Sequence, residues 1–294
     1  MERQLDIFDD SRDLALRNDI AQGLLRGDWP AAQRSAAALR AEFGDDPALA
    51  PAALLIEHLR DEAAAAPASI PDGATVLERR QRIEETLSHA ANELMGAADA
   101  RTWLARQWRA LARRAQPLPW QPEQPQAHAA SLYLQAGDWA DAAEAVRAIE
   151  SWRRIPQPLL WMTQACWHMQ GADAAWPLLT EALWLAPGRA RALLAQLPDK
   201  PLARLVRRFE ADFEPEDDPD WAWLPAWALV DQPALAEVLA GASSDADAAA
   251  IRGFRLVIAL LRLERAGRHH DVVEHRRQLR SLDERLFALY MRAR

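Results

Sequence analysis

Residues 126–187 contain two consecutive copies of one pattern: a short helix, a glycine turn and a second helix. Gly137 marks the turn of the first copy, and Gly171 marks the turn of the second, 34 residues later. Ala142 and Ala175 follow these glycines, so each second helix has a small residue where two antiparallel helices would approach closely. A repeat of this length favours helical hairpins stacked in an array, and another type of helical bundle is the alternative.

The residues around the two turns resemble the tetratricopeptide-repeat family. Tyr133 lies four residues before Gly137, as in the first helix of that family. Each second helix has a small residue followed by a bulky one, Ala142 with Val146 in the first copy and Ala175 with Leu179 in the second. Pro187 closes the second copy. The family's early Trp and its Leu-Gly pair are absent, so both copies are degenerate. The resemblance implies an all-α, right-handed superhelix of degenerate helical hairpins that ends in a capping helix.

Proline and charge patterns divide the 294 residues into four regions. Four prolines fall between Pro117 and Pro125 and predict a bend there. We expect N-terminal helical hairpins over 1–115, a Pro-rich bend over 116–125, central repeats over 126–213, and C-terminal hairpins with a cap over 214–294. Within the first region, Gly96 separates two long predicted helices. Ser281, with Glu284 three residues later, predicts a capping box for the last helix.

The number of cysteines and the length of the apolar runs indicate the cellular compartment. Cys166 is the only cysteine, which excludes a disulfide within the chain and favours a reducing compartment. The first residues are too charged for a signal peptide, and no apolar run reaches the roughly 18 residues of a membrane span. The sequence therefore predicts a cytoplasmic protein that does not cross a membrane. Lys200 is the only lysine beside 34 arginines, which suggests a GC-rich bacterial genome.

The charges are unevenly distributed along the chain. Residues 251–294 contain 11 Arg and 5 acidic residues, whereas residues 210–220 contain 7 acidic residues. One interpretation is that these segments are ordinary solvated surfaces. The other is a basic C-terminal lobe that meets an acidic partner, or the acidic segment of the chain itself.

Motifs for catalysis and for cofactor or metal binding are missing. His269, His270 and His275 are close in sequence, but adjacent helical residues project about 100° apart, which suits a shared metal poorly. We therefore predict no catalytic residue, no cofactor and no metal site. Most of the 13 tryptophans are expected in the core. The central repeats have few basic residues to accompany them, which argues against direct nucleic-acid binding.

The resemblance also implies a surface for a partner. In tetratricopeptide-repeat proteins, the first helix of each repeat lines the inner surface of the superhelix. The residues at the matching positions are Gln124, Ala127, Ser131, Leu134 and Gln135 in the first copy and Leu160, Gln164, Trp167 and His168 in the second. Such a wall of amides with one large aromatic ring suits an extended peptide or a helix. The alternative is that no groove is open.

The N-terminus contains one further short motif. Gln4, Leu5, Asp6, Ile7 and Phe8 resemble the peptide by which bacterial proteins dock on the sliding clamp of DNA polymerase, with Ile7 as the departure. The alternative is that Leu5, Ile7 and Phe8 pack against the first hairpin or play no role.

These observations predict a non-catalytic interaction scaffold or adaptor that binds a peptide or a helix in a groove. An adaptor of replication or repair, docked on the sliding clamp through residues 4–8, is one alternative. An enzyme of unknown reaction is the other.

Overall fold

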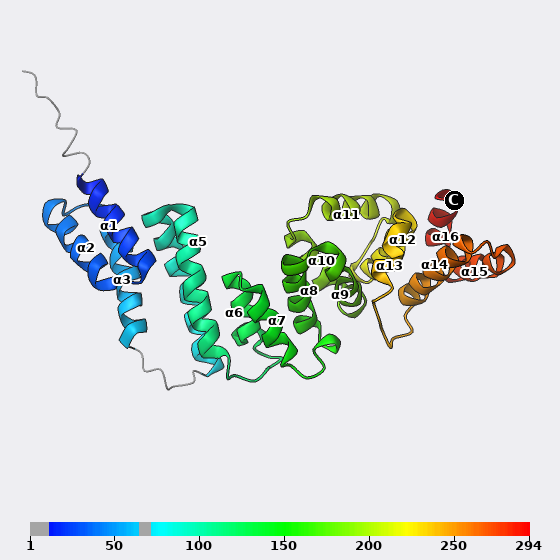
Figure 1. Cartoon of the computed structure of the whole chain (residues 1–294), viewed down its shortest axis with the longest axis horizontal. Coiled ribbons are helices and arrows are strands. Elements are labelled where there is room, and N and C mark those ends of the chain that lie inside the picture. The colour runs from blue at the N-terminus through cyan, green and yellow to red at the C-terminus, as the bar shows by residue number, and fades with distance from the viewer. Residues whose placement is uncertain (1–11, 65–71) are drawn as a thin grey trace, which may run out of the picture. The chain divides into compact units, whose positions relative to one another are not determined.

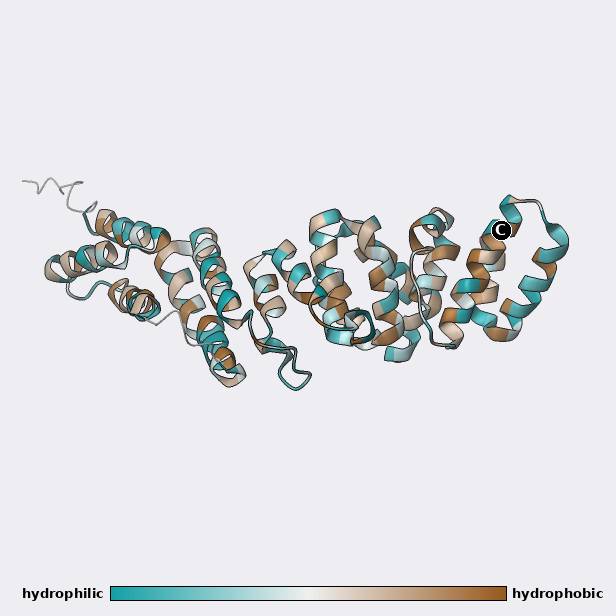
Figure 2. Ribbon diagram, turned by 60° about the horizontal axis from the view of Figure 1, so that its bottom comes forward, coloured by the Kyte–Doolittle hydropathy of each residue, from teal (hydrophilic) through white to brown (hydrophobic). Residues whose placement is uncertain are grey.

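The computed structural model describes residues 12–64 and 72–294, and every regular element in these residues is a helix (Figure 1). This confirms the expected all-α fold class, while the superhelical arrangement stays a prediction. The chain forms two compact units, the first of which ends at Asp138, while the second extends from Trp139 to Arg294. Figure 2 shows hydrophobic and hydrophilic residues mixed on most helices, as expected where one face is buried.

The first unit is built on a long helix, α5, to which most of its other helices attach. The helices α1, α3, α4 and α6 each pack against α5, and α1 and α2 pack against each other. The described elements of this unit are α1 (Arg12–Arg26), α2 (Trp29–Glu42), α3 (Leu49–Ala64), α4 (Gly73–Gln81), the π-helix η1 (Arg82–Leu87), α5 (Ser88–Ala115), the short 3-10 helix η2 (Pro125–Ala127) and α6 (Ala129–Ala136).

Two similar Gly-Asp-Trp turns have different roles in the chain. At the first turn, the Asp28 carboxylate accepts a hydrogen bond from the Ala31 amide at 3.0 Å and caps α2. At the second, Gly137 has a φ of 76° and ends α6, as its position in the sequence predicts. Asp138 then pairs with Arg109 of α5, with two contacts of 2.5 Å. The second aspartate therefore fastens the end of the first unit to its central helix.

Gly96 breaks α5, as the sequence predicts. Its φ of 73° and ψ of 166° lie in a backbone region that is essentially restricted to glycine. No atom outside its immediate neighbours lies within 4 Å of the position that a Cβ would take. A side chain at this position would therefore meet backbone strain without a steric clash.

We expect Gly96→Ala to lower the free energy of unfolding by about 1–3 kcal/mol through this strain alone. Gly44→Ala is the matched control, because Gly44 is exposed and a Cβ there would make only an ordinary contact, 3.6 Å from the Arg40 carbonyl. Urea denaturation of both variants measures the difference. Equal stability of the two variants would contradict the strained conformation of Gly96.

The second unit contains the remaining helices. Neighbouring helices pair along the chain, notably α7 with α8, α8 with α9, and α14 with α15. The elements are α7 (Trp139–Arg147), η3 (Trp152–Arg154), α8 (Pro156–Gln170), α9 (Ala172–Leu185), α10 (Pro187–Gln196), α11 (Lys200–Phe213), η4 (Asp218–Trp223), α12 (Leu224–Asp231), η5 (Pro233–Leu235), α13 (Ala236–Leu239), α14 (Ala249–Arg265), α15 (His269–Leu282) and α16 (Glu284–Arg292).

A cluster of aromatic rings forms part of the core of the second unit. The Phe209 ring lies 5.1 Å from that of Phe213, 5.4 Å from that of Trp221 and 5.6 Å from that of Trp227. All four side chains are buried. Ala142 and Ala175, where the sequence predicts close helix approaches, are also fully buried. The tryptophan-rich composition therefore contributes to a buried aromatic core.

The predicted cap of the last helix is wrong. Ser281 lies in the final turn of α15, and the residue that caps α16 is Asp283, whose carboxylate accepts a hydrogen bond from the Leu286 amide at 2.6 Å. The physical reason is that α15 continues through Leu282, which extends the helix beyond the fully buried Leu279.

The basic C-terminal lobe meets part of the acidic segment of its own chain. Arg285 of α16 donates a hydrogen bond to the Phe213 carbonyl at 2.5 Å, and its guanidinium lies 4.4 Å from the centre of the Phe213 ring. This contact involves a carbonyl and an aromatic face and no carboxylate.

Candidate functional site

The clamp-type peptide, residues 4–8, falls outside the described residues. Its docking on a sliding clamp therefore stays a prediction.

The first half of the predicted partner groove lies in the first unit, on α6 and the segment before it. Ser131 and Leu134 are buried, Gln124 is half-buried and Gln135 is exposed. The Ser131 hydroxyl donates to Gln126 Oε1 at 2.8 Å and accepts from Arg80 at 3.0 Å. The serine is thus engaged within the unit and is not free to bind a partner.

The second half of the predicted groove lies in the second unit, on α8. Leu160 and Trp167 are buried, Gln164 is half-buried and His168 is exposed. The Trp167 ring packs edge-on against Trp176 of α9, at 6.5 Å between centroids, so the aromatic expected on the groove wall lies in the core. Burial extends around most of α8, which is typical of a helix covered on several sides.

His168 provides the one exposed ring among the predicted groove residues. It stacks on Trp139 of α7 at 3.9 Å between ring centroids and at 8° between planes. Partial burial lowers the pKa of His168, which favours the neutral imidazole. Because the two sets of residues belong to different units, the single groove that joins them stays a prediction.

An open groove that the sequence did not predict lies between α14 and α15. Its volume is about 640 Å³. The lining residues recur at intervals of three and four along each helix, and they are Arg252, Arg255, Leu256 and Ala259 of α14 and His275, Gln278, Ser281 and Leu282 of α15. The sequence does contain this spacing of three and four residues, but the many arginines of residues 251–294 obscure it.

The apolar part of this groove is half-exposed and its rim is cationic. Leu256, Ala259 and Leu282 are each half-buried, whereas Arg252 and Arg255 are exposed. Arg252 pairs with the exposed Asp247 at 3.0 Å. Arg255 donates to the Ser244 carbonyl at 2.7 Å and has no carboxylate partner among the residues that the structure describes. None of the eight described lining residues is acidic.

The histidine of the groove is held in one orientation. His275 Nδ1 lies 2.9 Å from the Asp271 carbonyl, which can only accept a hydrogen bond. Nδ1 therefore donates, and in the neutral ring Nε2 is left as an acceptor. The groove thus offers apolar side chains, guanidinium groups and an imidazole.

A second depression in this unit, of about 570 Å³, contains charges of both signs. Its buried carboxylate, Glu181, pairs with Arg153 at 3.2 Å and accepts the Ser243 amide at 3.0 Å. The carboxylate is thus satisfied by the chain itself and fixes the loop before α14.

Groups suited to covalent or metal chemistry are not concentrated in the described part of the chain. Burial raises the pKa of the Cys166 thiol, which keeps it protonated. Residues 12–64 and 72–294 contain no group of three or more His, Cys, Asp or Glu side chains placed to hold a metal ion. No described helix combines the length and the apolar character needed to span a bilayer.

The function of the chain has to be inferred from these contacts, because no family model, no curated protein and no solved structure matches it.

Proposed function

We propose that this chain is a non-catalytic interaction protein of the cytoplasm that binds an acidic amphipathic helix of a partner protein in the groove between α14 and α15. The observation that supports this proposal is the combination of half-exposed apolar residues with exposed arginines and no acidic residue in the groove lining. Amphipathic helices dock into such grooves through side chains spaced three and four residues apart.

Charge complementarity decides which partner the groove favours. A basic helix would face Arg252 and Arg255, whereas an acidic helix would replace the carbonyl contact of Arg255 with a stronger contact to a carboxylate. The apolar residues Leu256 and Leu282 would pack against the apolar stripe of the partner. The expected partner therefore has leucine-like residues on one face and Glu or Asp beside them.

The test is fluorescence anisotropy with two labelled helical peptides that share one leucine stripe. One peptide has Glu at the flanking positions and the other has Lys. We expect the Glu peptide to bind and the Lys peptide not to bind, with an affinity that falls as salt is added. Failure of the Glu peptide to bind, or equal binding of the two peptides, would contradict the proposal.

A pair of charge reversals locates the binding site. Arg255→Glu is expected to weaken binding of the Glu peptide by about tenfold or more, since the groove would then repel it. Arg292→Glu is the matched control, because it makes the same change of charge at an exposed residue of α16 outside the groove lining. Equal loss of binding in both variants would indicate a general effect of net charge.

A further inference from the structure

A polar cavity of about 240 Å³ lies in the first unit, well away in sequence from the α14–α15 groove. Three helical segments line it with residues three and four positions apart: His58, Asp61 and Glu62 of α3, Arg79, Arg82 and Ile83 of α4 and η1, and Gln107 and Leu111 of α5. The volume is smaller than the roughly 300–1,000 Å³ typical of sites for drug-sized ligands. The cavity suits a small molecule.

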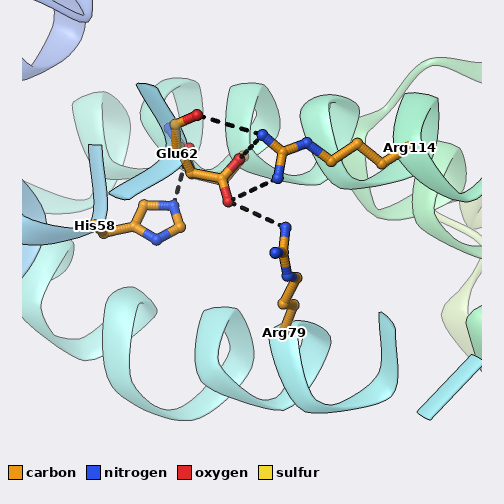
Figure 3. A network of polar contacts seen from close by, with 5 residues as sticks. His58, Glu62, Arg79 and Arg114 are labelled. Atoms are coloured by element: carbon orange, nitrogen blue, oxygen red, sulfur yellow. Dashed lines mark hydrogen bonds and ion pairs between the residues drawn. The ribbon is translucent and has the colours of Figure 1, made fainter. Parts of the chain in front are cut away.

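One wall of the cavity is fixed by Glu62 (Figure 3). Its carboxylate is 2.9 and 3.2 Å from the two terminal nitrogens of Arg114, and 3.3 Å from Arg79. The glutamate therefore ties α3 to both α4 and α5. Since Glu62 pairs with both Arg79 and Arg114, we do not expect any of the three to be the main binding group for a charged ligand.

The neighbouring group on α3, His58, has a defined tautomer. Gln107 Nε2 donates to the Trp103 carbonyl at 3.3 Å, which turns Gln107 Oε1 toward His58 Nε2 at 3.2 Å. An amide oxygen can only accept, so His58 Nε2 carries the proton. Burial lowers the pKa of His58, which keeps the ring neutral, with Nδ1 as an acceptor. Within the described residues, Nδ1 has no hydrogen-bond partner.

Two charged groups at the cavity lack strong partners. The Arg82 guanidinium makes no hydrogen bond or ion pair with any residue in the described ranges. Asp61 has only a long contact of 3.8 Å to Arg60, and both side chains are about half exposed. The cavity therefore presents one available cation, one available anion and one neutral acceptor.

The π-helix η1 contributes Arg82 and Ile83 to this cavity. A π-helix is rare, and in proteins short π segments occur frequently at functional sites. Ile83 and Leu111 are buried and give the cavity an apolar side. A rare helix type and a polar cavity thus coincide at one place in the fold.

We propose that this cavity binds a small zwitterion of the aliphatic amino acid class. The ligand carboxylate pairs with Arg82, the ammonium group donates to His58 Nδ1 and pairs with Asp61, and the aliphatic side chain lies against Ile83 and Leu111.

Other ligand classes fit these groups less well. A simple anion would satisfy Arg82 and would also face the Asp61 carboxylate, which has no strong partner. A simple cation would face Arg82. An uncharged apolar molecule would leave the charges of Arg82 and Asp61 without partners, and the buried His58 Nδ1 would lose free energy by remaining unpaired.

Isothermal titration calorimetry of the full chain with L-leucine, L-isoleucine and L-valine tests the proposal. N-acetyl-L-leucine lacks the cationic ammonium group, and L-leucinamide lacks the carboxylate. We expect at least one of the three amino acids to bind. In the leucine series, we expect each modified compound to bind about tenfold more weakly or worse. No binding of any amino acid, or equal binding of N-acetyl-L-leucine and L-leucine, would overturn the proposal.

Two variants assign the binding to this cavity. Arg82→Gln and Asp61→Asn are each expected to weaken binding of the amino acid by about tenfold. Arg113→Gln is the matched control, because Arg113 is an exposed arginine of α5 outside the lining. All three positions are exposed, so thermal melts should show intact folds. Unchanged affinity in Arg82→Gln would overturn the assignment of the ligand carboxylate.

Discussion

Replacement of Phe209 by alanine is expected to lower the free energy of unfolding of the second unit by about 3–5 kcal/mol. The Phe209 side chain is fully buried and lies within 5.1–5.6 Å, between ring centroids, of three other aromatic rings. The substitution removes the ring's apolar contacts, leaves a cavity, and abolishes edge-to-face pairs that add stability beyond the buried area. Urea denaturation followed by tryptophan fluorescence measures the loss.

Leu185→Ala is the control for this prediction. Leu185 is another large hydrophobic residue of the second unit, but it is 42% exposed. We expect a change within about 0.5 kcal/mol, as for most surface substitutions. Similar losses in the two variants would show that the aromatic cluster is not the main support of this unit.

Features that depend on a few adjacent residues could be predicted from the sequence. The break at Gly96 and the turn at Gly137 follow from the conformational freedom of glycine, and both are present. The last helix was also expected, but its cap was assigned to Ser281 although the nearby Asp283 has the same capacity. Which of two capable residues caps a helix depends on where the preceding helix stops.

Features that depend on distant residues could not be predicted. The repeat pattern does not show that α6 packs on the long helix α5, which precedes the Pro-rich segment. Trp167 was expected on a groove wall because a repeat pattern gives its position on α8, but it does not show how many neighbours cover that helix.

The polar cavity was even harder to predict from the sequence, because its residues are far apart in the chain. His58 and Gln107 are 49 residues apart, and Glu62 and Arg114 are 52 residues apart. Each residue alone looks like an ordinary polar side chain on a helix. Only the packing of α3 and α4 on α5 brings the charges together, so the sequence gives no local signal for this site.

The second prediction with a large effect is a loss of folding stability at acidic pH, and it depends on His128. This buried histidine caps α6, because its Nδ1 accepts a hydrogen bond from the Ala130 amide at 3.2 Å. Burial lowers the pKa of His128 from its ordinary value of 6.5 to about 4. Protonation would place a charge in a desolvated site, and it would also occupy the lone pair that caps the helix.

The sign of the effect follows from proton binding. Between pH 6.5 and about 4, the unfolded chain binds a proton at His128 and the folded chain does not. The contribution of His128 to stability is therefore complete above pH 6.5 and is lost progressively as the pH falls toward 4. From pH 7.5 to pH 5 we expect a loss of about 2 kcal/mol. The lowered pKa of the buried His58 acts in the same direction.

His128→Asn isolates this contribution, because asparagine is also a favoured N-cap residue and does not titrate. The variant loses some apolar contact at every pH, so its stability at pH 7.5 is not the relevant measure. The relevant measure is the difference between the free energies of unfolding at pH 7.5 and pH 5, obtained by urea denaturation. We expect this difference to shrink by about 2 kcal/mol in the variant. If the difference stays as large as in the wild type, the acid sensitivity arises from other groups and His128 is not the buried neutral cap inferred from its contacts.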